Sequence, residues 1–231
     1  MENTDGNPNE ISTALLTDLK EDRKIVSSPK TESATKFEIL KKCVAFLKNK
    51  NSDIQLEALA ILSDGFSLLT KETILAAIPH LLALLNPNTT TVKVITHALL
   101  LISTIIKNHD DREKDVKVFM ENNFISRLRQ LLDSSSIPMI IAVLTCIINI
   151  TSIDTYITSF IGSGGLSKLL KLMNHREPNI VRNVVKIVMI LIKDPGQRQA
   201  VLKTIGIEKC QQIFQEYYSK FVRPLLLVSK L

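Results

Sequence analysis

The sequence predicts an all-α protein, an α-solenoid in which a helical unit is repeated along the chain. Three observations predict this fold: two apolar patterns recur at intervals of about 40 residues, polar segments separate them, and the composition suits packed helices. Of the 231 residues 45% are hydrophobic, yet the chain contains no Trp and only 7 Gly. Aliphatic side chains fill the ridges and grooves of packed helices, whereas β-sheet proteins need glycine at tight turns.

Residues 1–35 are predicted to form a mostly disordered tail, and residues 36–231 a repeat domain. The tail is rich in Asn, Thr, Ser, Asp, Glu and Lys and lacks sustained hydrophobic periodicity. A short amphipathic piece, "ISTALLTDL", interrupts the tail. We expect this piece to become helical on contact with a partner or with the repeat domain.

The first apolar pattern has apolar residues at positions 0, 3, often 4, and 7, which is one face of an α-helix. It begins at Leu40, Ile78, Ile125, Leu166 and Ile207. These starts are 38, 47, 41 and 41 residues apart. The longest interval contains the charged run "HDDREKD", residues 109–115, which we interpret as an inserted, solvated loop.

The second apolar pattern follows each of the first four after a polar break, with apolar residues at positions 0, 4, 5 and 8. It begins at Ile54, Val94, Met139 and Ile180. Breaks such as "KNKNSD" and "LNPNTT" supply the side chains that cap helices. Shorter amphipathic segments, such as "DTYITSFIGSGG", precede some first-pattern helices. The predicted units are therefore approximately 36–70, 71–108, 109–152, 153–194 and 195–231.

A unit of roughly 42 residues with one short and two longer helices resembles the armadillo repeat. The segments "AIPHLLALLN" and "GSGGLSKLLKLMNHREPNIVRNVVKIVMIL" are similar to that family's sequences. The resemblance covers residues 37 to about 220. It implies a right-handed α-solenoid of about four to five armadillo-like repeats that acts as a protein-interaction scaffold or adaptor. The HEAT repeat is the related alternative, and the short extra helix favours the armadillo repeat.

The resemblance also implies where a partner binds, because the second-pattern helices of such a stack line a concave groove. In members that clamp a peptide backbone, positions 6 and 10 of these helices carry Trp and Asn, and only Asn149 matches here. The candidate groove residues are Ala60, Asp64, Leu100, Thr104, Thr145, Asn149, Arg182, Lys186 and Ile190. This groove grades from small and apolar to basic, so we expect a protein partner with an apolar helix and an acidic flank. The segment "ISTALLTDLKED" has the same character and is an alternative occupant.

No arrangement of residues for catalysis, a cofactor or a metal emerges from the sequence. The 4 histidines are widely separated and lack metal-ligand spacing, and His97 is expected to be a hydrogen-bonded core or groove residue. "GSGG", residues 162–165, is interpreted as the turn between a short and a long helix. The longest apolar stretch, residues 137–150, is shorter than the roughly 20 residues of a membrane span and favours a buried helix. We expect no enzyme activity, no cofactor and no membrane span.

The net charge of +6 is concentrated near the C-terminus. Residues 166–231 contain twelve Lys or Arg and four Asp or Glu, a net charge of +8. Nucleic acid or an anionic surface is therefore the alternative partner, through this basic third of the chain.

Cysteine usage and the last three residues suggest two locations. Cys43, Cys146 and Cys210 are widely spaced in apolar runs, which favours reduced thiols and a cytoplasmic or nuclear protein. The tripeptide Ser229, Lys230 and Leu231 matches a peroxisomal import signal. The cytoplasm is the expected location and the peroxisome is the alternative.

Overall fold

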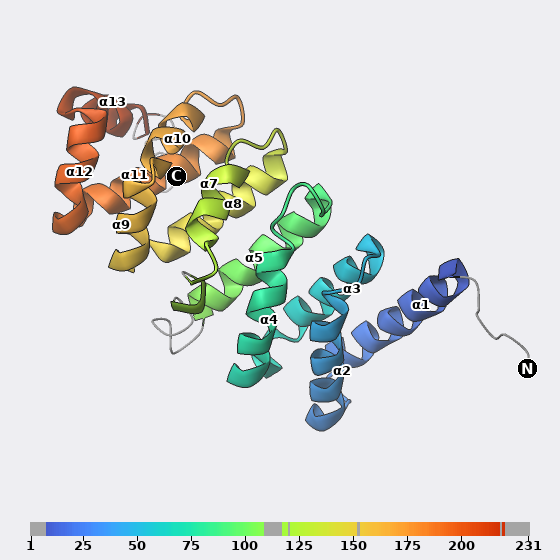
Figure 1. Ribbon diagram of the computed structural model, residues 1–231. Helices are drawn as coiled ribbons and strands as arrows, with labels where there is room; N and C mark the ends of the chain where they lie inside the picture. Colours follow the sequence, from blue (N-terminus) through green and yellow to red (C-terminus); the bar gives the residue numbers. More distant parts are fainter. Residues whose placement is uncertain (1–7, 109–116, 120, 152, 218, 220–231) are drawn as a thin grey trace, which may run out of the picture. The chain divides into compact units, whose positions relative to one another are not determined.

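The computed structural model describes residues 8–108, 117–119, 121–151, 153–217 and 219. The chain divides into two compact units, residues 1–111 and residues 112–231. In both units the described residues are mainly α-helical (Figure 1), as the two apolar patterns predict.

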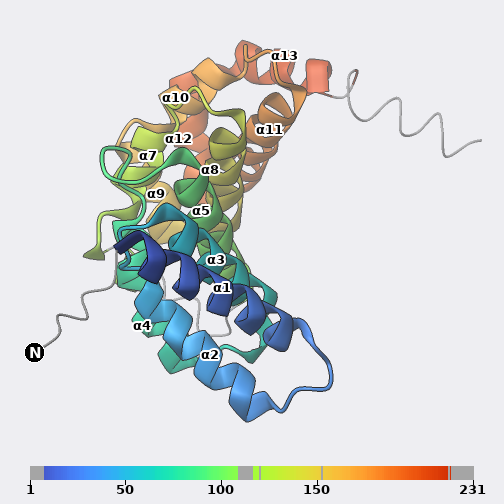
Figure 2. The ribbon, with the colours of Figure 1, turned by 90° about the vertical axis from the view of Figure 1, so that its right-hand side faces the viewer.

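The first unit has two layers of helices. One layer contains α1 (Pro8–Ser27), α3 (Ser52–Asp64) and α5 (Val92–Asn108), and the other contains α2 (Ser33–Phe46) and α4 (Lys71–Ala83). A single 3-10 turn, η1 (Phe66–Leu68), precedes α4. Helix α3 lies between α1 and α5 and packs against both (Figure 1 and Figure 2). The first pattern forms α2 and α4, and the second pattern forms α3 and α5.

Helix α1 corrects the prediction that residues 1–35 are mostly disordered. It has 20 residues and packs mainly against α3, with Leu19 and Val26 only 0% and 4% exposed. Its apolar face is narrow, so the sequence alone showed only the short piece around Leu15 and Leu16. Most helical stability in proteins comes from packing, and here α3 supplies the surface against which α1 packs.

In the second unit, first-pattern and second-pattern helices again alternate. Its helices include α7 (Phe124–Leu131), α8 (Ile137–Ile150), α9 (Asp154–Gly162), α10 (Gly165–Leu172), α11 (Pro178–Lys193), α12 (Pro195–Ile205) and α13 (Ile207–Tyr217). The second-pattern helices α8 and α11 pack side by side, and the shorter α9 and α12 precede the first-pattern helices α10 and α13. Helix α8 coincides with the apolar stretch 137–150 and buries eight side chains, which confirms a buried helix.

Side chains cap all four second-pattern helices at the predicted polar breaks. Each cap oxygen accepts a hydrogen bond from a backbone N–H group in the first turn, where no intrahelical partner exists. The caps are Asn51 for α3, Thr91 for α5, Ser136 for α8 and Glu177 for α11. The breaks therefore delimit the helices as their composition predicts.

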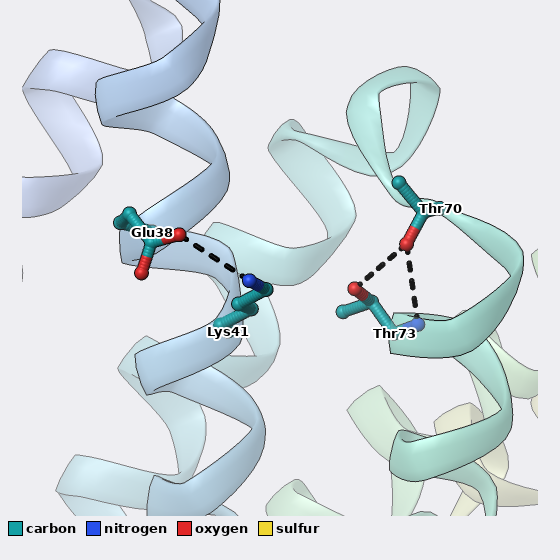
Figure 3. A network of polar contacts seen from close by, with 4 residues as sticks. All are labelled: Glu38, Lys41, Thr70 and Thr73. Carbon is teal, nitrogen blue, oxygen red and sulfur yellow. Dashed lines mark hydrogen bonds and ion pairs between the residues drawn. The ribbon is translucent and has the colours of Figure 1, made fainter.

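Local polar contacts occur on both helices of the first-pattern layer in the first unit (Figure 3). Thr70 caps α4: its Oγ1 accepts the N–H of Thr73 at 3.3 Å and lies 3.0 Å from the Thr73 hydroxyl. On α2, Lys41 Nζ donates to Glu38 Oε1 at 3.3 Å, across one helical turn. Thr73 is buried, and the contact with Thr70 gives its hydroxyl a hydrogen-bond partner there.

The "GSGG" segment forms the turn between α9 and α10, as interpreted from the sequence. Gly164 has a φ of 84°, a left-handed backbone conformation that is strained for any residue with a side chain. The ring of Phe160 lies against Gly165 and occupies the space of a Cβ atom. Both glycines therefore serve this turn.

Two predicted features lie outside the described residues. These are the inserted loop, residues 109–115, and the tripeptide Ser229, Lys230 and Leu231.

Candidate functional site

An open groove of about 500 Å³ lies in the first unit along α3 and α5. Its lining residues are spaced by 3 and 4 along each helix, which places them on one face. The lining consists of Leu56, Glu57, Ala60, Ser63 and Asp64 from α3, Lys93, His97, Leu100 and Thr104 from α5, and Arg23 from α1.

All four candidate residues that were predicted in the first unit line this groove. They are Ala60 and Asp64 on α3 and Leu100 and Thr104 on α5. They share this face because positions 6 and 10 of the second pattern lie one turn apart on the helix face opposite the buried positions. A binding role for these four residues stays a prediction.

The other candidates lie on the paired helices α8 and α11 of the second unit. Thr145 and Asn149 are half-buried on α8, Arg182 and Lys186 are exposed on α11, and Ile190 is half-buried. Neither helix contains an Asp or Glu, so this pair carries only positive charge. A binding role for these five residues stays a prediction.

Leu100 gives the groove an exposed apolar surface. Its side chain is 45% exposed, and it faces the groove, whereas the aliphatic residues Leu99 and Leu101 on either side of it are buried. The neighbouring polar groups bond to their own helix: Thr104 Oγ1 donates to the Leu100 carbonyl at 3.0 Å, and His97 Nδ1 lies 2.9 Å from the Lys93 carbonyl. His97 is thus a hydrogen-bonded groove residue, as predicted.

Arg23 of α1 lies against the acidic side of the groove. Its Nε donates to Asp64 Oδ2 at 2.7 Å, and its Nη1 is 3.5 Å from Glu57 Oε1. The hydrogen bond to Asp64 is the main reason why the pKa of Arg23 is raised above its ordinary value. The side chains of Arg23 and Asp64 are 43% and 36% exposed, so solvent weakens their attraction.

Sequence reasoning missed part of this lining. Glu57 lies seven residues before Asp64, and Lys93 lies seven before Leu100, so both share a helix face with a predicted residue. Extending the register by two turns would have found them. Arg23 gave no such signal, because it lies in the segment that was predicted to be a disordered tail.

The same segment does not fill the groove, although it was an alternative occupant. Helix α1 packs beside α3 and contributes Arg23 to the groove lining, while the groove itself stays open. The apolar residues of α1, such as Leu19, are used in packing against the first unit.

Other reactive groups are sparse in the described part of the chain. No group of three or more His, Cys, Asp or Glu there could hold a metal ion, and no described helix is long and apolar enough to cross a membrane. Cys43, Cys146 and Cys210 are buried and form no disulfide, and burial raises the pKa of Cys43 to about 12.

Comparison with known proteins identifies the fold. No protein-family model and no curated protein match the chain. A designed armadillo repeat protein in complex with the peptide (KR)4 matches with a TM-score of 0.72 and 20% identity, over 94% of this chain and 89% of its own. Computationally designed armadillo repeat proteins for modular peptide recognition match at 0.66 and 20%, over 90% and 87%. An engineered protein matches at 0.72 and 20%, over 94% and 86%.

The chain therefore has an all-α solenoid fold of the armadillo type. This is the fold that the two apolar patterns and the family resemblance predicted.

Proposed function

We propose that this protein is a non-enzymatic interaction scaffold that binds a helix or peptide of a partner protein in the groove along α3 and α5. The observation that carries the proposal is Leu100, a large apolar side chain exposed inside an open groove. Exposed apolar surface in a hollow rimmed by polar groups is typical of binding sites. The designed neighbour in complex with (KR)4 supports a peptide as the kind of ligand that this fold accepts.

The partner is proposed to have an apolar helix face and an acidic flank. Leu56 and Leu100 offer the apolar contact, one from each wall of the groove. Of the groove charges, Glu57 and Asp64 are both engaged by Arg23. Lys93 forms no ion pair with any described residue and remains available to a carboxylate. Lys186, exposed on α11, offers the same chemistry in the second unit.

The binding of a synthetic amphipathic helix tests this proposal directly. The labelled peptide carries leucines on one face and glutamates at one end, and fluorescence anisotropy measures its affinity for the full chain. We expect Leu100→Asp to weaken binding by about tenfold or more, because it places a charge in the apolar contact and repels the acidic flank.

Val92→Asp is the matched control. Val92 is also exposed on α5, at 50%, but does not line the groove, and the variant has the same change in charge. Equal losses in Leu100→Asp and Val92→Asp would contradict the groove as binding site. Circular dichroism first establishes that both variants keep their helix content.

A salt titration of RNA binding distinguishes the proposed function from the alternative, which is nucleic-acid binding through the basic residues 166–231. Binding of RNA that weakens steeply with salt and is lost in Lys186→Glu would favour the alternative. No RNA binding even at low salt would remove it.

We propose the cytoplasm as the location, supported by three buried cysteines that form no disulfide, which suits a reducing compartment. Imaging of a fluorescent protein fused to the N-terminus tests this. A punctate signal that disperses when Leu231 is deleted would instead establish the peroxisomal alternative.

A further inference from the structure

Arg23 connects the N-terminal helix to two carboxylates inside the groove. Glu57 and Asp64 are separated by two turns on the same face of α3, and the guanidinium of Arg23 reaches both, at 3.5 Å and 2.7 Å. All three side chains line the groove. The contact bridges 41 residues of sequence between Arg23 and Asp64, so it exists only when α1 packs on α3.

The charge of the α3 wall depends on this contact. Helix α3 contains Asp53, Glu57 and Asp64 and no Lys or Arg, so without α1 its groove face would present two uncompensated carboxylates. Arg23 supplies a cation whose planar fork suits carboxylates, and its bond to Asp64 raises its own pKa. With Arg23 in place, the two acidic groups are already engaged, and Lys93 on the opposite wall determines which ligand charge is favoured.

We propose that α1, through Arg23, sets the charge selectivity of the groove: it excludes the cationic side chains of peptides from Glu57 and Asp64 and leaves the groove selective for an acidic ligand. The inference rests on the proposed function in using this groove as the binding surface. It adds that the selectivity is supplied by a residue outside the repeats.

A gain of binding tests the inference without knowledge of the natural partner. The probe is a labelled octapeptide of alternating lysine and arginine, measured by fluorescence anisotropy with the full chain at low salt. We expect Arg23→Ala to bind this peptide about tenfold more tightly than the wild type, because two carboxylates become available to its cations. Arg23→Lys retains a positive charge, so it should bind the basic peptide almost as weakly as the wild type does.

Two further variants separate this effect from net charge. Lys20→Ala removes one positive charge from the exposed surface of α1 outside the groove lining and should leave the affinity at the wild-type value. Adding Glu57→Gln and Asp64→Asn to Arg23→Ala should abolish the gain.

Three outcomes would overturn the inference: no gain in Arg23→Ala, an equal gain in Lys20→Ala, or a gain that survives the loss of both carboxylates. The acidic amphipathic peptide of the previous section is measured in parallel. If the acidic peptide fails to bind while Arg23→Ala still raises the affinity for the basic peptide, the proposed partner is wrong and the role of Arg23 stands. If it binds without any effect of Arg23 on either peptide, the groove function stands and this inference fails.

Discussion

The ring of Phe160 at the end of α9 packs directly on Gly165 at the start of α10 and fills the position where a side chain would begin. Phe160 is fully buried, so the ring cannot move into solvent. The two short helices can meet at this close distance only because residue 165 lacks a Cβ atom.

We therefore expect Gly165→Ala to lower the free energy of unfolding by about 1–3 kcal/mol, the usual effect of overpacking a filled core. Urea denaturation followed by circular dichroism measures the change. The control is Gly162→Ala, where a Cβ would meet no atom within 4 Å and the change should stay within about 0.5 kcal/mol. Similar losses in both variants would show that the contact with Phe160 is not the cause.

Leu19→Ala should release α1 from the first unit more than it unfolds the repeats. Leu19 is fully buried, and replacing a buried leucine by alanine in a protein core lowers the free energy of unfolding by about 2–5 kcal/mol. A terminal element of a stacked structure packs on one side only and can open by itself. Hydrogen exchange should therefore be about tenfold or more faster for α1 amides, with α11 amides unchanged.

The exposed Lys20→Ala variant serves as the comparison for Leu19→Ala. It should leave exchange of the α1 amides at the wild-type rate. If Leu19→Ala instead speeds hydrogen exchange equally for the amides of all helices in the first unit, α1 opens only together with the repeats.

Asp194→Ala should destabilise the protein through the start of α12. Asp194 Oδ1 accepts hydrogen bonds from the N–H groups of Gly196 at 2.7 Å and Gln197 at 3.1 Å. Loss of such a cap lowers the free energy of unfolding by about 1 kcal/mol, whereas Asp194→Asn keeps the acceptor and should lose less. Glu32, at the N-cap of α2, makes no side-chain cap bond, so Glu32→Ala should have little effect in the same urea experiment.

Stability should fall at alkaline pH partly because of Cys43. Burial raises its pKa from 9.0 to about 12, so between these values the folded chain holds a proton that the unfolded chain has released. The stabilising contribution is complete below pH 9 and is lost as pH rises towards 12. Urea denaturation across this range should show a steeper decline for the wild type than for Cys43→Ala.

Thiol labelling provides an independent check on Cys43. Because the thiolate is the reactive form, native Cys43 should react far more slowly at pH 8 than the same cysteine in urea. Reaction of native Cys43 at the unfolded rate would contradict both its burial and its raised pKa.

Much of the fold could be predicted because its signals are local. The recurrent spacing of residues such as Ile54 and Ala58 defines a helix face, and break residues such as Asn51 and Ser136 provide caps within the same segment. The register then placed Leu100 and Thr104 on the groove face, since a helical position follows from counting along the chain.

The sequence by itself determined the recurring helices, their order, the caps between them and which residues of α3 and α5 share a helix face. Only the tertiary structure decided that residues 8–27 form a helix and that Arg23 joins the groove. The physical reason is the range of the interactions: caps and helix faces depend on residues a few positions apart, whereas α1 is stabilised by burying Leu19 and Val26 in the first unit. The pairing of Arg23 with Asp64 spans 41 residues, so no local sequence pattern predicts it.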